Sequence, residues 1–152
     1  MKNLPLQNIK VLEFTHAVMN PAAGLIMADL GAEVIHIEPL EWDSTRRLKG
    51  FGIGYHSFYN WNKKSLAVDI ESEKGREIIF KMVETADVLI ENFGPETMER
   101  LGFGYEVLSI INSTLVYYSL KGFLTRPYEK RHAMDEVVQM MGGLTYMTGP
   151  VG

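Results

Sequence analysis

The chain has 152 residues, of which 46% are hydrophobic and 22% charged, and its formal net charge is −4 at pH 7. This composition is typical of a globular protein that buries a core, and the acidic balance argues against nucleic-acid binding as its main task. With no cysteine, no signal-peptide pattern and no apolar run near the roughly 18 residues of a membrane span, disulfides and thiolate sites are excluded, and we expect a cytoplasmic protein that does not bind membranes.

The first forty residues predict a strand, a helix and a second strand. Residues 9–14 (IKVLEF) form a short apolar run, and residues 33–38 alternate as the second strand. Between them we expect Asn20 to cap a helix that Gly31 ends. The glycine fingerprint of a dinucleotide site is absent and is replaced by residues 15–21 (THAVMNP). The unit therefore predicts α/β architecture without an ordinary NAD site.

The alternation of strands and helices continues along the rest of the chain. Residues 39–60 have no clear period and predict a long loop, a kind of segment that often carries function. Strands separated by helices favour one domain with a Rossmann-like parallel sheet, whose ligands bind beyond the carboxyl ends of the strands. The further expected strands are residues 65–70, 87–91 and 115–120, the expected helices are residues 72–86, 95–102, 106–111 and 134–141, and residues 147–152 form turns.

Residues 11–39 (VLEFTHAVMNPAAGLIMADLGAEVIHIEP) resemble the opening of the class III CoA-transferases, the formyl-CoA transferase and carnitine CoA-transferase/bile-acid-inducible protein F type. Similar segments follow in the family's order over nearly the whole chain. The resemblance covers only the N-terminal portion of that family, so we expect residues 1–152 to be the N-terminal part of its large CoA-binding domain, without the remainder of the family's chain. These segments are NKKSLAVD (62–69), DVLIENF (87–93), LGFGY (101–105), LVY (115–117), GGL (142–144) and TG (148–149).

The resemblance implies an enzyme that moves CoA between an acyl-CoA thioester and a free carboxylic acid. In this family an aspartate attacks the thioester and gives a mixed anhydride, from which CoA thiolate makes an aspartyl-CoA thioester. The substrates would be acyl-CoA and a carboxylic acid, with no metal, and the full-length protein would be an intertwined homodimer or part of a hetero-oligomer. An alternative is a non-catalytic CoA-binding or dimerisation subunit that supports a catalytic partner.

The resemblance also implies which residues bind CoA. Pro39 stands where formyl-CoA transferases carry an arginine, so Arg46 or Arg47 in the next loop could supply that charge instead. Glu71 stands where relatives can have a lysine, which weakens phosphate binding at this point. The expected CoA-binding residues are Ala17, Val18, Val68, Asn92, Phe93, Arg100 and Lys121.

The catalytic carboxylate is not evident in this sequence. The transferases place it in a T-G-x-x-D pattern, and counting from Thr148 brings that position to Gly152, which has no nucleophile. Asp135 is another candidate, although an acid at that place also suits the first turn of a helix. Racemases of this fold have a histidine directly before an aspartate; here Met134 precedes Asp135, which disfavours racemisation, and His132 is displaced by two residues.

Overall fold

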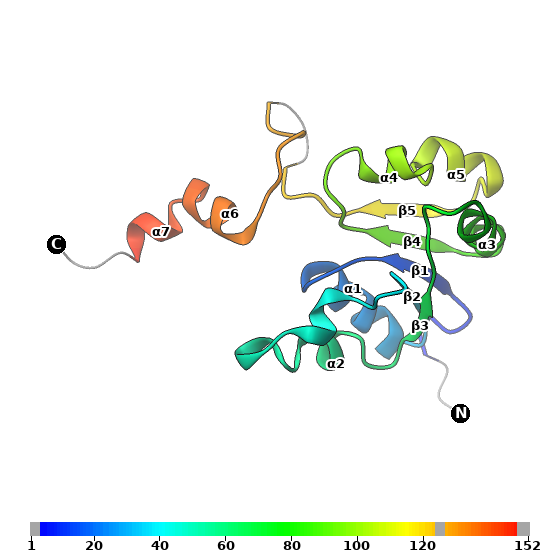
Figure 1. Ribbon diagram of the computed structural model, residues 1–152, viewed down its shortest axis with the longest axis horizontal. Helices are drawn as coiled ribbons and strands as arrows, with labels where there is room; N and C mark the ends of the chain where they lie inside the picture. Colours follow the sequence, from blue (N-terminus) through cyan, green and yellow to red (C-terminus); the bar gives the residue numbers. More distant parts are fainter. Residues whose placement is uncertain (1–3, 124–126, 149–152) are drawn as a thin grey trace.

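Five parallel strands form a single sheet in the order β3-β2-β1-β4-β5 (Figure 1). The structure is a computed structural model and describes residues 4–123 and 127–148. It confirms the predicted parallel α/β sheet, and β2 has the predicted bounds. The strands are β1 (Lys10–Phe14), β2 (Glu33–Glu38), β3 (Lys64–Ala67), β4 (Val88–Glu91) and β5 (Val116–Ser119).

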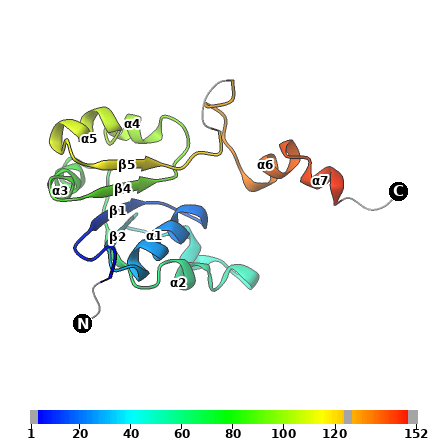
Figure 2. The same ribbon diagram turned by 180° about the vertical axis from the view of Figure 1, so that it is seen from behind.

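Helices cover both faces of this sheet (Figures 1 and 2). α1 and α2 lie over one face and α3, α4 and α5 over the other, while α6 and α7 extend away from the sheet beyond the carboxyl end of β5. The helices are α1 (Met19–Asp29), η1 (Ser44–Arg47), η2 (Gly50–Gly52), α2 (Tyr55–Tyr59), α3 (Glu73–Val83), α4 (Thr97–Leu101), α5 (Tyr105–Ile111), α6 (Asp135–Met141) and α7 (Leu144–Met147).

The core has two parts because β1, at the centre of the sheet, is buried on both faces. Leu12 and Phe14 point into the larger part, under α3, α4 and α5, where they meet Ile79 and Phe103. Val11 belongs to the smaller part under α1. A central parallel strand covered on both sides is expected to be a continuous apolar run, and residues 9–14 fit that pattern except at Lys10, where the strand begins, and at Glu13.

The start of α1 differs from the prediction. Val18, not Asn20, is the N-cap residue, and no side chain caps the helix. The chain turns early because Ala17 adopts a positive φ of 64°. Asn20 consequently lies in the first helical turn, where it is buried. The predicted end is confirmed, since Gly31 has a φ of 102°, a conformation that glycine adopts readily.

The long loop predicted at residues 39–60 contains the short helices η1, η2 and α2. Their sequences have no apolar period, and polar contacts described below hold η1 against the sheet. The four-residue helix α7 was also not expected; it follows Gly143, whose φ is 76°. The predicted turn at residues 149–152 lies outside the described residues.

Candidate functional site

The strand order reverses between β1 and β4, so the loops that leave these two strands meet at the carboxyl edge of the sheet. Phe14 and Glu91 are the last paired residues of the two strands. Ligands of open α/β sheets bind in the crevice at such a reversal. The structure brings together here four of the residues predicted to bind CoA, which are Ala17, Val18, Asn92 and Phe93.

The Asn92 side chain joins the two loops. Its Oδ1 accepts the backbone N–H of His16 at 3.0 Å, and its Nδ2 donates to the carbonyl of the same residue at 2.9 Å. The next residue, Ala17, is in the left-handed region that non-glycine residues rarely adopt, a conformation that needs support from its surroundings. Asn92 therefore holds the turn between β1 and α1. A contact between its amide group and CoA stays a prediction.

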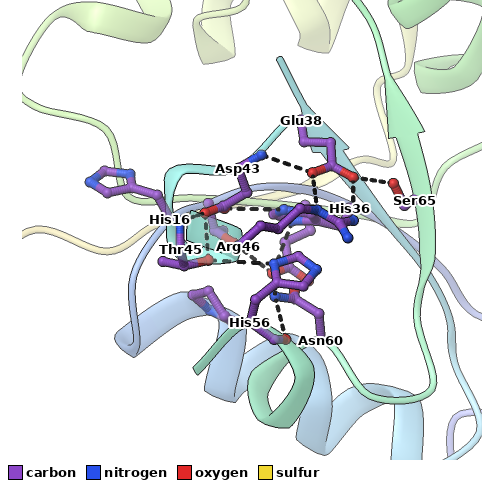
Figure 3. A network of polar contacts seen from close by, with 12 residues as sticks. His16, His36, Glu38, Asp43, Thr45, Arg46, His56, Asn60 and Ser65 are labelled. Carbon is purple, nitrogen blue, oxygen red and sulfur yellow. Dashed lines mark hydrogen bonds and ion pairs between the residues drawn. The ribbon is translucent and has the colours of Figure 1, made fainter. Parts of the chain in front are cut away.

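Phe93 provides a flat surface beside this turn. Its ring stacks on that of His16, with centroids 6.0 Å apart and planes inclined by 26°. Phe93 is half-buried, and it both packs against the larger core and lines the cleft described below. The His16 ring is exposed and, in Figure 3, points away from the buried polar groups.

Lys121 is held by protein groups at the end of β4. Its Nζ lies 2.8 Å from Glu91 Oε1 and donates to the carbonyl of Phe93 at 2.7 Å. Glu91 is buried and also accepts the backbone N–H of Phe93 at 2.9 Å. The charge of Lys121 is thus balanced by the Glu91 carboxylate, and the ammonium group of Lys121 holds the backbone of Phe93 in place. Its predicted contact with CoA remains untested.

A cleft with a volume of about 520 Å³ opens beside Phe93, over the carboxyl ends of β1, β2 and β3. Val68, another predicted CoA-binding residue, is part of its apolar floor. Such a floor suits a flat aromatic ligand group, because most small-molecule sites are apolar with a few polar groups. The lining consists of Phe14, Ile37, Glu38, Pro39, Leu40, Glu41, Val68, Asp69, Ile70, Glu71 and Phe93.

The cations predicted for phosphate binding do not line this cleft. Arg46 is turned inward, where its Nε and Nη2 donate to both oxygens of Glu38 at 3.0 and 2.7 Å. Arg100 lies on α4 and is exposed, with no side-chain hydrogen bond or ion pair to any of the described residues. Of the predicted cations, Arg100 and the exposed Arg47 are thus available to a ligand, whereas Arg46 is occupied.

A buried polar network lies under the segment that connects β2 to β3 (Figure 3). Glu13, fully buried one residue before the end of β1, lies 2.8 Å from the Lys63 ammonium group and accepts a hydrogen bond from the Thr15 hydroxyl. Lys63 also donates to the carbonyl of Pro21 at 2.9 Å. Removal of one partner from such a pair leaves an unbalanced charge in the interior, so the two residues depend on each other.

His36 of β2 lies between two carboxylates of this network. Its Nδ1 is 3.6 Å from Glu13 Oε1 and its Nε2 is 3.4 Å from Asp43 Oδ2. Burial alone would lower the pKa of His36, but Asp43 and Glu13 outweigh burial and raise it to about 9. The pKa of Asp43 is lowered, because His36 and the hydroxyl and N–H of Thr45 outweigh its burial. The imidazolium thus bridges the sheet and the loop.

Glu38, at the end of β2, is the third buried acid of the network. It accepts hydrogen bonds from Arg46, from the Ser65 hydroxyl and from the backbone N–H of Asp43. Burial raises the pKa of Glu38, but these three donors outweigh it and lower the pKa to about 2. These contacts bind the segment after β2 to the sheet without a large apolar interface.

Reasoning from the sequence missed this network. The four histidines showed no metal-ligand spacing, and the other members are scattered over some fifty positions. One signal was available, namely an acid inside an apolar strand: Glu13 interrupts the run IKVLEF. A glutamate at such a position is almost never fully buried unless it is paired, so Glu13 in this strand indicated a buried cationic or hydrogen-bonding partner.

The described candidates for the catalytic step do not line the cleft. Asp135 is exposed at the start of α6, where its carboxylate accepts a hydrogen bond from Gln139 at 2.5 Å, and Gly152 lies outside the described residues. The His132 ring lies against Gly94, where an added Cβ would be 2.6 Å from the ring. This histidine is therefore close to the loop after β4, a position that the sequence did not indicate.

The described residues contain neither a cluster of metal ligands nor a membrane-spanning helix. Within residues 4–123 and 127–148, no group of three or more histidine, aspartate or glutamate side chains is placed to hold a metal ion. In the same part of the chain, no helix has the length and apolar character needed to cross a bilayer.

Comparisons with known proteins identify relatives of this chain. The profile described as CoA-transferase family III matches residues 6–152. A formyl-CoA:oxalate CoA-transferase of Streptomyces coelicolor is 38% identical over 148 residues, which are 95% of this chain and 36% of the relative. An acetyl-CoA:oxalate CoA-transferase of Acetobacter aceti is 41% identical over 150 residues, 95% of this chain and 39% of the relative. The chain thus spans less than two fifths of these relatives.

Solved structures give the same result. A CAIB/BAIF family protein from Brucella suis superposes with a TM-score of 0.87 at 38% identity, covering 97% of this chain and 42% of that protein. A hypothetical protein from Mycobacterium tuberculosis superposes with a TM-score of 0.86 at 35% identity, covering 97% of this chain and 41% of that protein. The fold described above is therefore the fold of these larger proteins over the matched part.

Proposed function

Because this chain belongs to CoA-transferase family III, we propose that it supplies the CoA-binding part of an enzyme that moves CoA from an acyl-CoA thioester to a free carboxylic acid. One observation carries the proposal. The strained turn at Ala17, the stacked Phe93 ring and the apolar cleft lie at the carboxyl edge of the sheet, where the strand order reverses. This edge is the expected ligand position of the fold.

The groups at this edge suit different parts of CoA. The apolar floor with Val68 and Phe93 suits adenine or pantetheine, and the turn at Ala17 and Val18 offers backbone groups at the N-terminus of α1, where anions are favoured. Arg100 is a predicted cation that is exposed and can contact a phosphate, since its planar fork matches phosphate oxygens. Lys121 and Asn92 would act by holding Phe93 and the Ala17 turn in place.

The proposed chemistry needs a carboxylate nucleophile. An aspartate would attack the thioester carbonyl and release CoA thiolate, which would then attack the resulting anhydride and release the first acid as a carboxylate. The acceptor carboxylate would then attack the aspartyl thioester and release CoA thiolate, leaving a second mixed anhydride. The thiolate would attack the acceptor's carbonyl in that anhydride, which gives the new acyl-CoA and frees the aspartate. We assign no described residue to the nucleophile, because Glu91 is engaged by Lys121 and Asp135 lies on the segment that extends away from the sheet (Figure 1).

The substrates and partners belong to the same proposal. The names of the relatives suggest formyl-CoA or acetyl-CoA as donor and oxalate as acceptor. We also propose a homodimer, a cytoplasmic location and no resident metal. A non-catalytic CoA-binding subunit is the alternative, and it would bind CoA without forming a covalent adduct.

A mass-spectrometric experiment separates these functions. The protein in its full natural length is incubated with formyl-CoA or acetyl-CoA, with and without oxalate, and CoA affinity is measured by calorimetry. We expect CoA binding, an aspartate adduct of CoA and loss of that adduct when oxalate is added. CoA binding without an adduct under turnover conditions would favour the non-catalytic subunit, and absence of CoA binding would refute the proposal.

A further inference from the structure

The cleft over β1, β2 and β3 has an unusual charge for a site that receives a phosphate-rich ligand. Among the described residues that line it, none is basic and four carry a carboxylate. Glu38 is balanced by Arg46, which leaves Glu41, Asp69 and Glu71 at the rim. These three are exposed, and none forms an ion pair within the described residues.

The position of these acids suggests what they recognise. In doubly wound nucleotide-binding folds, an acid after the second strand accepts hydrogen bonds from ribose hydroxyls, whereas an arginine there accommodates a phosphate on the ribose. In this chain β2 ends with Glu38 and is followed by Pro39, Leu40 and Glu41, none of which can donate a side-chain hydrogen bond. Arg100 is exposed and does not line the cleft, so it would contact the pyrophosphate rather than the ribose.

We propose that the acidic rim of this cleft disfavours the phosphate on the ribose of CoA, so that the protein binds 3′-dephospho-CoA at least as tightly as CoA. The proposal rests on the CoA-binding function proposed above and specifies which form of the nucleotide the cleft prefers. The ribose hydroxyls would face the carboxylates, and the adenine would lie on the apolar floor with Val68 and Phe93.

Calorimetry with both nucleotides tests the proposal, using the protein in its full natural length. We expect dephospho-CoA to bind as tightly as CoA or more tightly at 50 mM salt. A rise to about 500 mM salt should favour CoA relative to dephospho-CoA, because it screens the repulsion between phosphate and carboxylates.

Charge-reversal variants locate the effect. Glu71→Lys and Glu41→Lys change exposed side chains, and each should strengthen CoA binding about tenfold relative to dephospho-CoA, whose ribose hydroxyls lose a carboxylate acceptor. Glu84→Lys is the matched control. It makes the same change of charge at the exposed end of α3, which leads to the opposite edge of the sheet, and it should leave the preference unchanged.

Three results would count against the proposal in different ways. Tighter binding of CoA than of dephospho-CoA by the unmodified protein at 50 mM salt would overturn it and keep the proposed function intact. An equal shift in Glu84→Lys would assign the effect to net charge rather than to the rim and would also overturn it. Absence of binding for both nucleotides would instead refute the CoA-binding function itself.

Discussion

The carboxamide of Asn92 holds both polar atoms of the His16 backbone, at 3.0 and 2.9 Å. The two residues are 76 positions apart in the chain, and the contact joins the loop after β1 to the loop after β4. The next residue in the chain, Ala17, has a positive φ. A side chain of this kind can satisfy a donor and an acceptor at once, which no carboxylate can do.

The substitution Asn92→Asp should weaken CoA binding. It keeps the shape but turns an oxygen toward the His16 carbonyl in place of the donor, which should cost about 1–3 kcal/mol of unfolding free energy. We expect CoA affinity to fall about tenfold, measured by calorimetry. Asn112→Asp is the matched control, because Asn112 donates to the carbonyls of Val83 and Ala86 at the other edge of the sheet. It should lower stability without changing CoA affinity. Unchanged CoA affinity in Asn92→Asp would show that this contact does not organise the site.

Arg100→Ala and Lys121→Ala should have different effects, although the sequence predicted the same role for both residues. Arg100 is exposed, so its loss should change stability by less than about 0.5 kcal/mol and weaken CoA binding about tenfold. Loss of Lys121 leaves the Glu91 carboxylate without its cation and should cost about 2 kcal/mol.

Urea unfolding and calorimetry on both variants distinguish these roles. The double variant Lys121→Ala/Glu91→Gln should recover part of the lost stability, because the uncompensated charge is removed. Full stability in Lys121→Ala would contradict the role that we assign to the pair Lys121–Glu91.

Gly24→Ala should destabilise the protein, although alanine normally favours a helix. A Cβ at this position in α1 would lie 2.2 Å from Glu13 Oε2 and 3.0 Å from Lys63 Nζ. The buried pair would have to move, at a cost of about 2–4 kcal/mol. Gly54 provides the control, because its Cβ would have nothing within 4 Å. Urea unfolding should show Gly54→Ala within about 0.5 kcal/mol of the unmodified protein. Equal midpoints for both variants would mean that α1 can shift away from Glu13.

The stability of the fold should fall on the alkaline side because of His36. Its pKa is raised from 6.5 to about 9, so the folded state holds a proton that the unfolded state releases. This stabilisation is complete below pH 6.5 and is lost as the pH rises through 9, a change of at most about 3 kcal/mol. On the acid side, Glu38 acts in the opposite sense: its stabilisation is complete above its ordinary pKa of 4.5 and is lost as the pH falls toward 2.

Urea unfolding between pH 6 and 9.5 measures the alkaline slope. His36→Gln should remove most of the slope, whereas His16→Gln, which changes an exposed ring, should keep it. The variants also separate His36 from Lys63, whose pKa burial lowers against the pull of Glu13. An imidazole pKa below 6.5 for His36 in an NMR titration would contradict the prediction.

The sequence was sufficient for the sheet and for the family. Apolar runs separated by glycines predicted five strands and their parallel arrangement, because the hydrophobic pattern of β1, β2 and β4 is local. The strand order β3-β2-β1-β4-β5 was not predicted. The start of α1 was placed late, since the left-handed conformation of Ala17 depends on Asn92, which is far away in the chain. A contact between two such distant residues produces no periodic pattern in the sequence.

Side-chain roles were harder to predict than positions. Phe93 was expected at a strand end and Val68 within the strand 65–70, and both line one cleft. Arg46 and Lys121 were expected to face a ligand, but each lies against a buried glutamate. A sequence shows that a cation is present but not which carboxylate it balances, because that depends on packing between distant segments. Whether these residues bind CoA stays a prediction.

The buried glutamates couple formation of the sheet to docking of the segments that follow its strands. Glu13, Glu38 and Glu91 each end or nearly end a strand, and each is balanced by a cation from a later segment, Lys63, Arg46 or Lys121. A strand end that loses water before its cation arrives holds an isolated charge, which is strongly unfavourable. The sheet should therefore close only together with the segments that follow each strand, and a nascent chain that ends before Lys63 should keep the end of β1 hydrated or protonated. Folding of the sheet and docking of its loops would then be a single cooperative event.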